Sequence, residues 1–321
     1  MLIAKGLDTM RYWETRRVIV TGGAGFLGRH LVAALQAEGA VVFVPRSKNY
    51  DLRTRNGVCH MFEDVGRPDF LFHLAATVGG IGANMETPAD FLFQNTIMNT
   101  LVMEQARIVN AGKIIAVGSV CSYPKWCPTP FVEDNLWNGY PEETNAPYGE
   151  SKRALLVHLQ AMRRQYGING VYLIPTNLYG PGDNVNPSTS HVIPALILRM
   201  LDAQRKGEPL TVWGTGNASR DFLYVTDCAE ALMLAAEWYS DGDPVNLGSG
   251  QETTIAALVQ MLADIIGYDG EIIWDKSRPD GQPRRVLNTS RAWHEFGWKA
   301  GTDLRDGLAQ TVAWMKEVCI A

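Results

Sequence analysis

A tyrosine and a lysine stand four residues apart in the stretch "YGESK", at Tyr148 and Lys152. In a helix this spacing places both side chains on one face, one turn apart. An ammonium group beside a phenol favours the phenolate and lowers the tyrosine pKa, so the phenol can exchange protons near neutral pH. Taken alone, such a pair is usually a surface lysine and a half-buried tyrosine. Ser119, which ends the strand-like run "IIAVGS", is a candidate to hydrogen-bond the same substrate oxygen.

Two further side chains are candidates to move protons. Cys121 lies two residues beyond Ser119 and would point to the same side if the strand continued that far. A free cysteine is more often a small buried hydrophobe. His191 precedes "VIP" at an expected helix start, where capping the helix is the competing interpretation. Both thiol and imidazole titrate close enough to neutrality to act as acid or base.

A glycine-rich stretch, "TGGAGFLG", follows one expected strand and opens an expected helix. Gly22, Gly25 and Gly28 have the spacing of a dinucleotide-binding turn, which aims a pyrophosphate at a helix N-terminus. After the second strand, "VPRSKNYDL" carries a cationic cluster around Arg46 where an NAD site would usually carry an acidic residue. The cluster favours NADP, with a solvated basic loop as the alternative, and Asp51 is placed to contact adenine.

Short β-branched runs alternate with helical patterns from about residue 17, which is typical of a parallel α/β sheet. Long helices are expected at about 88–110 and 148–167. After about residue 180 the alternation loosens. The sequence predicts a Rossmann-type doubly wound parallel sheet that binds NADP in residues 17–180. Residues 181–321 are expected to form a smaller, mixed α/β, mainly substrate-binding part, with segments exchanged between the two, and residues 1–16 an extension with no assigned role.

Composition narrows the class of protein. The 321 residues are 46% hydrophobic and 20% charged, with a net charge of −5, which argues against a nucleic-acid or membrane-surface partner. Five scattered cysteines form no disulfide framework, and no Cys/His cluster has the spacing of a metal site. The N-terminus lacks the apolar core of a signal peptide, and no apolar run reaches membrane-spanning length. We therefore expect a cytoplasmic protein without a bound metal.

The motifs "TGGAGFLG", "HLAA" and "YGESK", with Ser119, resemble the extended short-chain dehydrogenase/reductase superfamily. Longer stretches resemble the GDP-L-fucose synthase family: "AATVGGIGAN", "SVCSYP", "PTNLYGPGDNVNPSTSHVIPALI", "VWGTGNASRDF" and "DGQPRR". The resemblance runs from about residue 17 to the last helix. One departure is Val120, where we expect a small hydroxyl residue in relatives.

This resemblance implies a bifunctional NADPH-dependent enzyme that converts GDP-4-keto-6-deoxy-D-mannose to GDP-L-fucose by 3,5-epimerisation and 4-reduction. It implies that Tyr148 protonates the C4 oxygen, supported by Lys152 and Ser119, and that Cys121 and His191 are the epimerisation acid/bases. The cofactor residues that it implies are Gly22, Gly25, Phe26, Leu27, Gly28, Arg46, Asp51, Leu52, Ala75, Ala76, Gly118, Tyr148, Lys152, Pro175, Asn177, Leu178 and His191. The substrate residues that it implies are Asn177, Val192, Arg199, Trp213, Arg220 and Arg285.

Two of these residues also have a purely structural interpretation, since Trp213 could belong to the core and Asn177 to a turn. Extended members commonly dimerise through a four-helix bundle, for which helices 88–110 and 148–166 are the candidates. The closest alternative function is a GDP-mannose 3,5-epimerase or related GDP-sugar epimerase that consumes no cofactor. A 4-ketoreductase that does not epimerise, and a non-catalytic cofactor-sensing protein on the same fold, are the further alternatives.

Overall fold

The computed structural model describes residues 11–79, 81–186, 189–278 and 282–320. Its largest sheet has six parallel strands in the order β10-β5-β4-β3-β1-β2. This arrangement confirms the predicted doubly wound parallel sheet. The strand order departs in both directions from β1, so the crevice for a ligand lies at the carboxyl ends of β1 and β3. The strands are β1 (Arg17–Thr21), β2 (Val41–Phe43), β3 (Phe70–His73), β4 (Lys113–Val117), β5 (Gly170–Pro175) and β10 (Pro244–Leu247).

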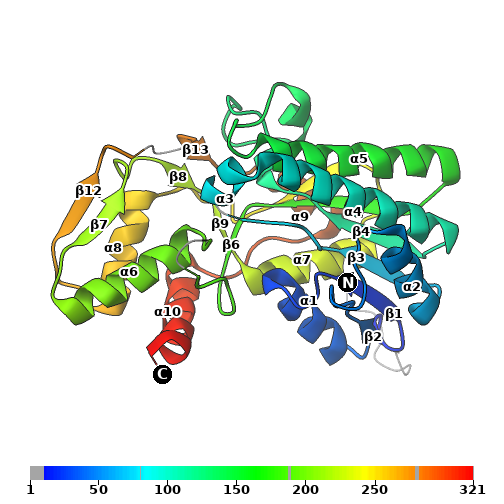
Figure 1. Cartoon of the computed structure of the whole chain (residues 1–321), viewed down its shortest axis with the longest axis horizontal. Coiled ribbons are helices and arrows are strands. Elements are labelled where there is room, and N and C mark those ends of the chain that lie inside the picture. The colour runs from blue at the N-terminus through cyan, green and yellow to red at the C-terminus, as the bar shows by residue number, and fades with distance from the viewer. Residues whose placement is uncertain (1–10, 80, 187–188, 279–281, 321) are drawn as a thin grey trace, which may run out of the picture.

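Helices cover both faces of this sheet (Figure 1). On one face α1 (Phe26–Ala37) packs against α7 (Val225–Trp238). On the other, α4 (Pro88–Ile108) lies between α2 (Arg55–Val65) and α5 (Ala146–Tyr166). Side chains alternate along β1, so that Val18 and Val20 join one core and Ile19 joins the other. Apolar side chains on both faces explain why the strands read as continuous hydrophobic runs.

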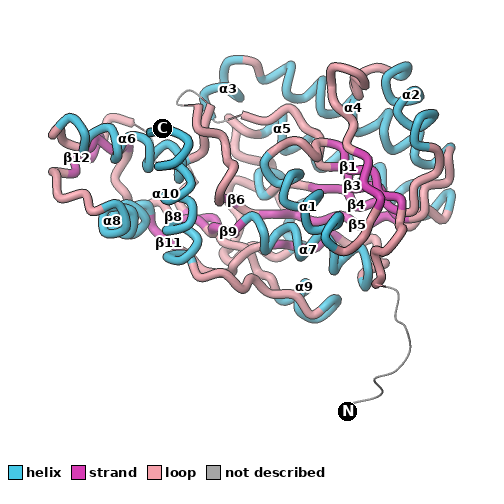
Figure 2. The backbone as a smooth tube through the Cα atoms, turned by 90° about the horizontal axis from the view of Figure 1, so that it is seen from below, coloured by secondary structure: helices cyan, strands magenta, loops and turns pink. Residues whose placement is uncertain are grey.

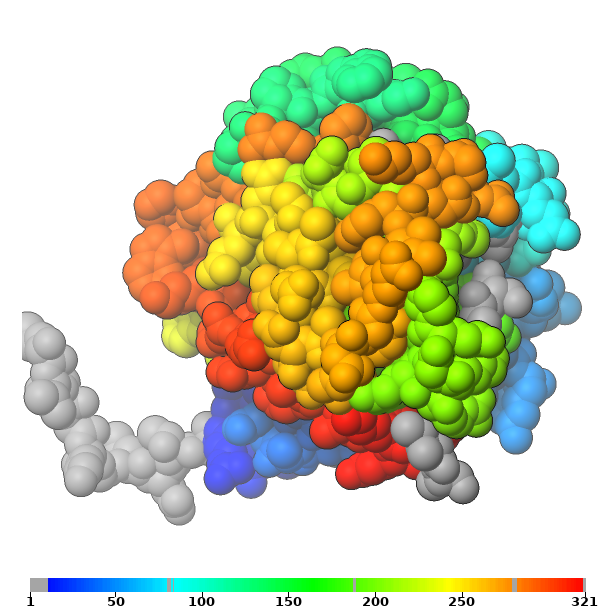
Figure 3. Space-filling model, turned by 90° about the vertical axis from the view of Figure 1, so that its left-hand side faces the viewer, coloured from blue at the N-terminus to red at the C-terminus, as the bar shows by residue number. Residues whose placement is uncertain are grey.

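A second part of the molecule has small sheets and its own core (Figure 1, left). Its helices α6 (Val192–Lys206), α8 (Ile255–Ile266) and α10 (Leu304–Ile320) share that core with β7 and β12. Figure 3 shows this side, with α8 and β12 in yellow and orange and α10 in red below them. The paired strands are β7 (Leu210–Trp213) with β12 (Ile272–Asp275), β6 (Asn177–Tyr179) with β9 (Phe222–Tyr224), and β8 (Ser219–Arg220) with β11 (Thr253–Thr254) and β13 (Arg284–Arg285).

The chain returns from this second part to the large sheet. Strand β10 pairs with β5, and α9 (Ser290–Phe296) packs against β10 and α7. Figure 2 shows α7 and α9 on the opposite side of the strands from α2, α4 and α5. The remaining elements are α3 (Ile81–Glu86) and the 3-10 turns η1 (Val120–Ser122) and η2 (Glu133–Trp137).

Part of the segment without an assigned role packs onto the sheet. Trp13 is buried, its ring centroid lies 4.8 Å from that of Phe70, and its indole N–H donates to Glu237. Residues 1–10 lie outside the described residues. Within the described ranges, no helix is both long and apolar enough to span a membrane.

Candidate active site

The glycine turn after β1 brings the backbone very close to the start of α1. Gly22 has a φ of 71°, and its carbonyl oxygen accepts the N–H of Gly25 at 2.9 Å. A Cβ on Gly28 would lie 2.2 Å from the Gly22 carbonyl oxygen, so only glycine permits this approach. Phe26 and Leu27 form the first turn of α1, whose N–H groups have no partner within the helix. The turn therefore offers backbone donors and the positive helix end to an anionic group.

Other predicted cofactor residues line the same edge of the sheet. A Cβ on Gly22 would lie 2.8 Å from the backbone nitrogen of Ala75, so the loops after β1 and β3 touch. Gly118 directly follows β4, and its N–H donates to the Leu173 carbonyl at 2.8 Å. The structure places the following residues at or just beyond strand carboxyl ends, where nucleotides bind in such sheets: Ala75, Ala76, Gly118, Pro175, Asn177 and Leu178.

The basic loop after β2 is exposed at Arg46 and Lys48. Asp51 is engaged by Arg53 at 2.8 Å, and the bonds from Arg53 lower the pKa of this carboxyl. Leu52 is buried in the core on the α2 side of the sheet. Among these predicted cofactor residues, Arg46 thus exposes its positive charge to solvent, whereas the Asp51 carboxylate is already paired with Arg53.

Ser119, Cys121 and Tyr148 come together at the end of β4. The strand ends at Val117, so the condition for Cys121 to follow Ser119 by strand alternation, a strand that continues to residue 121, is not met. Instead Ser119 caps the η1 turn, and its Oγ accepts the N–H of Cys121 at 3.2 Å. Tyr148 lies in the first turn of α5 and shares a hydrogen bond with Ser119. A local turn, rather than an extended strand, therefore brings the thiol to the Ser–Tyr pair.

The acidity of Tyr148 differs from the sequence prediction. Burial and the neighbouring Cys121 raise the pKa of Tyr148, and these effects outweigh the hydrogen bond from Ser119, which lowers it. Lys152 is buried, its Nζ donates to the Val117 carbonyl at 2.9 Å and lies 5.8 Å from the Tyr148 ring centroid. Burial lowers the pKa of Lys152 to about 8. The prediction of a lowered tyrosine pKa is therefore wrong for this structure, and Tyr148 holds its proton at neutral pH.

Arg285 reaches the thiol. Its Nη1 lies 3.9 Å from the Cys121 Sγ, and Gln282 Oε1 accepts two bonds from the same guanidinium at 3.0 and 3.1 Å. Sequence reasoning placed Arg285 on the substrate and did not connect it to Cys121. It also missed Gly149, where a Cβ would lie 2.5 Å from the Cys121 carbonyl oxygen. A glycine in the first turn of a helix was the available signal.

His191 stands apart from this cluster. It is the N-cap residue of α6 by backbone position, but its side chain makes no capping bond. The side chain is 56% exposed, and Nδ1 lies 3.8 Å from Oδ1 of Asp183, a residue that the sequence analysis missed. The neighbouring Asp183 carboxylate raises the pKa of His191 against the effect of burial. Among the described residues, His191 therefore contacts Asp183 and not Cys121.

The predicted substrate residues form two groups. Trp213 is 60% exposed, which excludes the core interpretation, and Arg199 and Arg278 lie 5.9 and 5.1 Å from its ring centroid. Arg199 also donates to the Thr211 carbonyl, and Val192 begins the same helix, α6. Arg220 donates to the carbonyl of Gln282, the residue that also holds Arg285. Arg278 was not predicted.

The turn interpretation of Asn177 is wrong, because the residue lies in strand β6. Its side-chain amide donates to the Asp221 carbonyl at 2.8 Å. The five cysteines are free, and burial raises the pKa of Cys127 to about 11. Among the described residues, no three or more His, Cys, Asp or Glu side chains are grouped to hold a metal ion.

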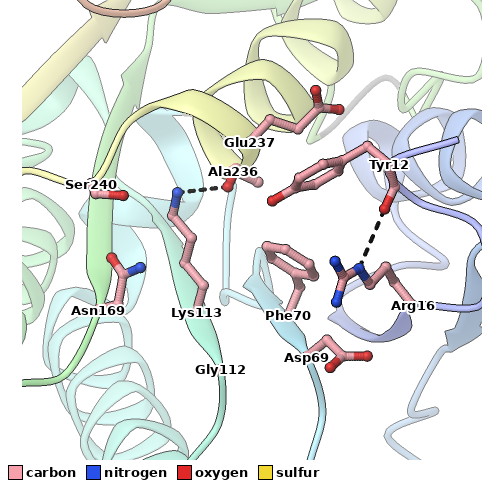
Figure 4. Close-up of a pocket in the computed structure, with 10 residues that line it drawn as sticks. All are labelled: Tyr12, Arg16, Asp69, Phe70, Gly112, Lys113, Asn169, Ala236, Glu237 and Ser240. Carbon is pink, nitrogen blue, oxygen red and sulfur yellow. Dashed lines mark hydrogen bonds between the residues drawn. The ribbon is translucent and has the colours of Figure 1, made fainter. Parts of the chain in front are cut away.

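A cavity of about 300 Å³ lies at the opposite edge of the sheet (Figure 4). Asp69, Gly112 and Asn169, beside the amino ends of β3, β4 and β5, contribute to its lining. Lys113 reaches up from β4 and donates to the carbonyls of Ala235 and Ala236 at 3.1 and 2.6 Å. Since these carbonyls belong to the last turn of α7, Lys113 caps that helix and the cavity lies away from the candidate active site.

The fold is that of a nucleotide-dependent enzyme, and Ser119, Tyr148 and Lys152 lie together at the carboxyl end of β4. The chain belongs to the NAD dependent epimerase/dehydratase family, whose model matches residues 18–248. It is 38% identical over 308 residues to GDP-L-fucose synthase 1 of Arabidopsis thaliana, covering 95% of each chain. It is 38% identical to the GDP-L-fucose synthase of Escherichia coli K12, covering 94% of this chain and 97% of that one. The predicted resemblance is confirmed.

Solved structures agree with this assignment. A GDP-L-fucose synthetase from Naegleria fowleri superposes with a TM-score of 0.85 at 28% identity, over 95% of this chain and 94% of that one. A GDP-6-OMe-4-keto-L-xylo-heptose reductase from C. jejuni superposes with a TM-score of 0.87 at 25% identity, over 95% and 98%. The described fold is thus shared by synthases and by 4-keto reductases of GDP-sugars.

Proposed function

We propose that this protein converts GDP-4-keto-6-deoxy-D-mannose to GDP-L-fucose, by 3,5-epimerisation and NADPH-dependent reduction at C4. The observation that carries the proposal is the thiol of Cys121 placed beside Ser119 and Tyr148. Serine, tyrosine and lysine suffice for a plain carbonyl reductase, whereas a thiol adds the further acid/base group that epimerisation needs. The GDP-L-fucose synthases at 38% identity support the same substrate.

NADPH supplies the hydride for C4 in this proposal. The glycine turn fits its pyrophosphate, because Gly28 lets the turn pack directly against the start of α1. The first N–H groups of this helix have no partner within the helix and suit an anion. Arg46, exposed after β2, suits the 2′-phosphate, and the related Naegleria fowleri synthetase has been solved bound to NADP. Residues 17–180 would mainly hold the cofactor and 181–321 mainly the substrate.

The chain's own groups would carry the proton transfers. Carbons beside a ketone lose protons readily because the carbanion delocalises as an enolate. Inverting such a carbon requires a base on one face and an acid on the other, which we assign to Cys121 and His191. Ser119 and Tyr148 would hydrogen-bond the developing oxyanion at C4. Tyr148, protonated at neutral pH, would then give its proton to this oxygen during reduction, and Lys152 would supply a nearby positive charge.

A GDP-sugar carries a diphosphate, which an enzyme of net charge −5 must bind through local cations. We assign this role to Arg199 and Arg220, with Trp213 as an exposed ring for the nucleotide. Arg278 lies over the same ring and joins them. Val192 and Asn177 are proposed sugar contacts, and Arg285 a contact next to the reacting carbons.

A GDP-sugar 4-reductase without epimerisation is the second candidate, favoured by the similarity to the C. jejuni reductase. A GDP-mannose 3,5-epimerase would consume no NADPH, and a cofactor sensor would turn over nothing. The experiment mixes the protein with GDP-4-keto-6-deoxy-D-mannose and NADPH, follows nicotinamide absorbance and identifies the product sugar. Oxidation of NADPH with formation of GDP-L-fucose supports the proposal. No oxidation, or a reduced sugar with unchanged C3 and C5, contradicts it.

The proposed assembly is a homodimer in which α4 and α5 of two copies form a four-helix bundle. The helices already pack against each other, and α4 exposes Phe93 and Ile108 while α5 exposes Val157. A cytoplasmic location stays a prediction.

A further inference from the structure

Asp183 is a buried carboxylate that faces an exposed imidazole. Its side chain is 2% exposed, and its Oδ1 lies 3.8 Å from the Nδ1 of His191. We propose that Asp183 is the positioning residue for His191: it orients the ring through Nδ1 and leaves Nε2 to exchange protons with the substrate. This inference rests on the proposed function and adds to it a group that acts through His191 without touching the sugar.

The fold holds Asp183 firmly in place. Its Oδ1 accepts the N–H of Asn184 at 2.7 Å, and its own N–H donates to the Gly180 carbonyl. Pro181 lies two residues before Asp183, and its carbonyl oxygen lies 2.8 Å from the Nε2 of His30 on α1. Helix α1 begins at the glycine turn of the proposed cofactor site. The contact between Pro181 and His30 therefore ties the segment that carries Asp183 to this helix.

The second oxygen of this carboxylate has no hydrogen-bond partner among the residues that the structure describes. Oδ2 of Asp183 is buried, and no hydrogen bond to it occurs within the described part of the chain. Buried carboxylates are normally paired or hydrogen-bonded, so such an oxygen calls for a cation nearby. The imidazolium of His191, beside the same carboxylate, is placed to supply that charge.

The pair gives His191 a defined direction of proton transfer. The Asp183 carboxylate, at ion-pair distance from Nδ1, raises the pKa of His191, and burial opposes this effect. A proton kept on Nδ1 faces the carboxylate, so the proton on Nε2 is the one that can leave. When His191 gives this proton to a carbon of the enolate, the ring becomes neutral and keeps its Nδ1 proton. The same logic operates wherever a carboxylate orients a catalytic imidazole.

Asp183→Asn tests the proposal with little change in shape. The amide oxygen of the new side chain can still accept the N–H of Asn184, so the turn is expected to fold. We expect the NMR titration of His191 to move to lower pH than in the unmodified protein. We expect deuterium uptake from D₂O at C3 and C5 of the substrate, measured without NADPH, to fall at least about tenfold in rate. The matched control is Asp64→Asn, which removes the carboxylate of another pair, His60 and Asp64, 3.4 Å apart.

Two outcomes would overturn the proposal. One is a His191 titration that Asp183→Asn leaves unchanged. The other is a tenfold loss of deuterium uptake that Asp183→Asn still causes in a His191→Ala background, which would mean that Asp183 acts on something other than the ring. The titration needs no substrate, so it reports on Asp183 even if the protein does not act on GDP-4-keto-6-deoxy-D-mannose.

Discussion

The two side chains assigned to epimerisation each have a charged neighbour, and the signs are opposite. Arg285 places a positive charge at the sulfur of Cys121, whereas Asp183 places a negative charge at the ring of His191. A thiol accepts a proton as the thiolate anion, and an imidazole donates one as the imidazolium cation. The charges around Cys121 and His191 therefore suit the base and the acid of the proposed epimerisation.

Cys121→Ser separates the two activities of the proposed enzyme. A serine hydroxyl holds its proton at neutral pH, so deuterium uptake from D₂O without NADPH is expected to fall about 100-fold or more. Reduction of the ketone that has not been epimerised should persist in part, because Ser119, Tyr148 and Lys152 are unchanged. Both rates are measured on the same preparation. Equal loss of exchange and NADPH oxidation would mean that the thiol only supports packing.

At the scale of elements, the site depends on how closely α5 approaches the η1 turn. The Ser122 Oγ donates to the Gly149 carbonyl at 3.1 Å, and the position of a Gly149 Cβ falls 2.5 Å from the Cys121 carbonyl oxygen. Two rigid backbone segments thus meet at a residue without a side chain. This contact sets the position of Tyr148 relative to Cys121.

Gly149→Ala is expected to push α5 away from η1. We expect a loss of about 1–3 kcal/mol in the free energy of unfolding, as for other overpacked sites, and a larger proportional loss of NADPH oxidation. Urea unfolding and steady-state kinetics measure the two effects. Gly301→Ala is the control, since a Cβ there meets nothing within 4 Å. Wild-type kinetics in Gly149→Ala would show that the spacing between α5 and η1 does not matter.

Elements were predictable from the sequence where the local pattern of apolar, polar and glycine residues agrees with their burial in the fold. The glycine turn, the strand into Ser119 and the "YGESK" helix start all have local signals. Strand β7 also had one: Leu210 and Val212 are buried while Trp213 is exposed, an alternation that argues against the core interpretation of Trp213.

Other features depend on contacts that sequence patterns do not carry. Helix α2 was not predicted. Its Asn56-Gly57 pair is typical of a turn, although Val58, Met61 and Phe62 have helical spacing and are buried together. Asp183 lies in a Pro-Gly turn, and its role comes from the anchoring of that turn on α1. The raised pKa of Tyr148 follows from burial, which spacing along a helix does not report.

At the scale of the whole molecule, a buried histidine links stability to pH. His73 ends β3, with Nδ1 2.8 Å from the Thr21 hydroxyl on β1 and Nε2 3.0 Å from the Asn99 side chain on α4. Burial, with the charge of Lys152 as a smaller cause, lowers the pKa of His73 from 6.5 to about 4. In the unfolded chain the ring gains a proton as pH falls below 6.5, but in the folded protein it stays neutral until about pH 4. Its contribution to stability is thus complete above pH 6.5 and is lost as pH falls towards 4.

His73→Gln is expected to reduce this acid sensitivity. From pH 7 to 4.5 the free energy of unfolding of the unmodified protein should fall by about 2–3 kcal/mol more than that of the variant. Urea titrations at both pH values measure the difference, with the exposed His60 changed to Gln as the control. An equal fall in the unmodified protein and in His73→Gln would assign the acid sensitivity to other groups.

The proposed dimer would form through exposed apolar side chains on α4 and α5. Phe93 is 64% exposed on α4, and Ile108 and Val157 are exposed on α4 and α5. A four-helix bundle between two copies would bury such apolar side chains, and a charge placed among them would remain unpaired. Phe93→Asp should therefore convert a dimer to a monomer in sedimentation, whereas Trp293→Asp, on the distant helix α9, should not. A mass unaffected by Phe93→Asp would exclude this helix pair as the interface, because the contact would have to tolerate a carboxylate at its centre.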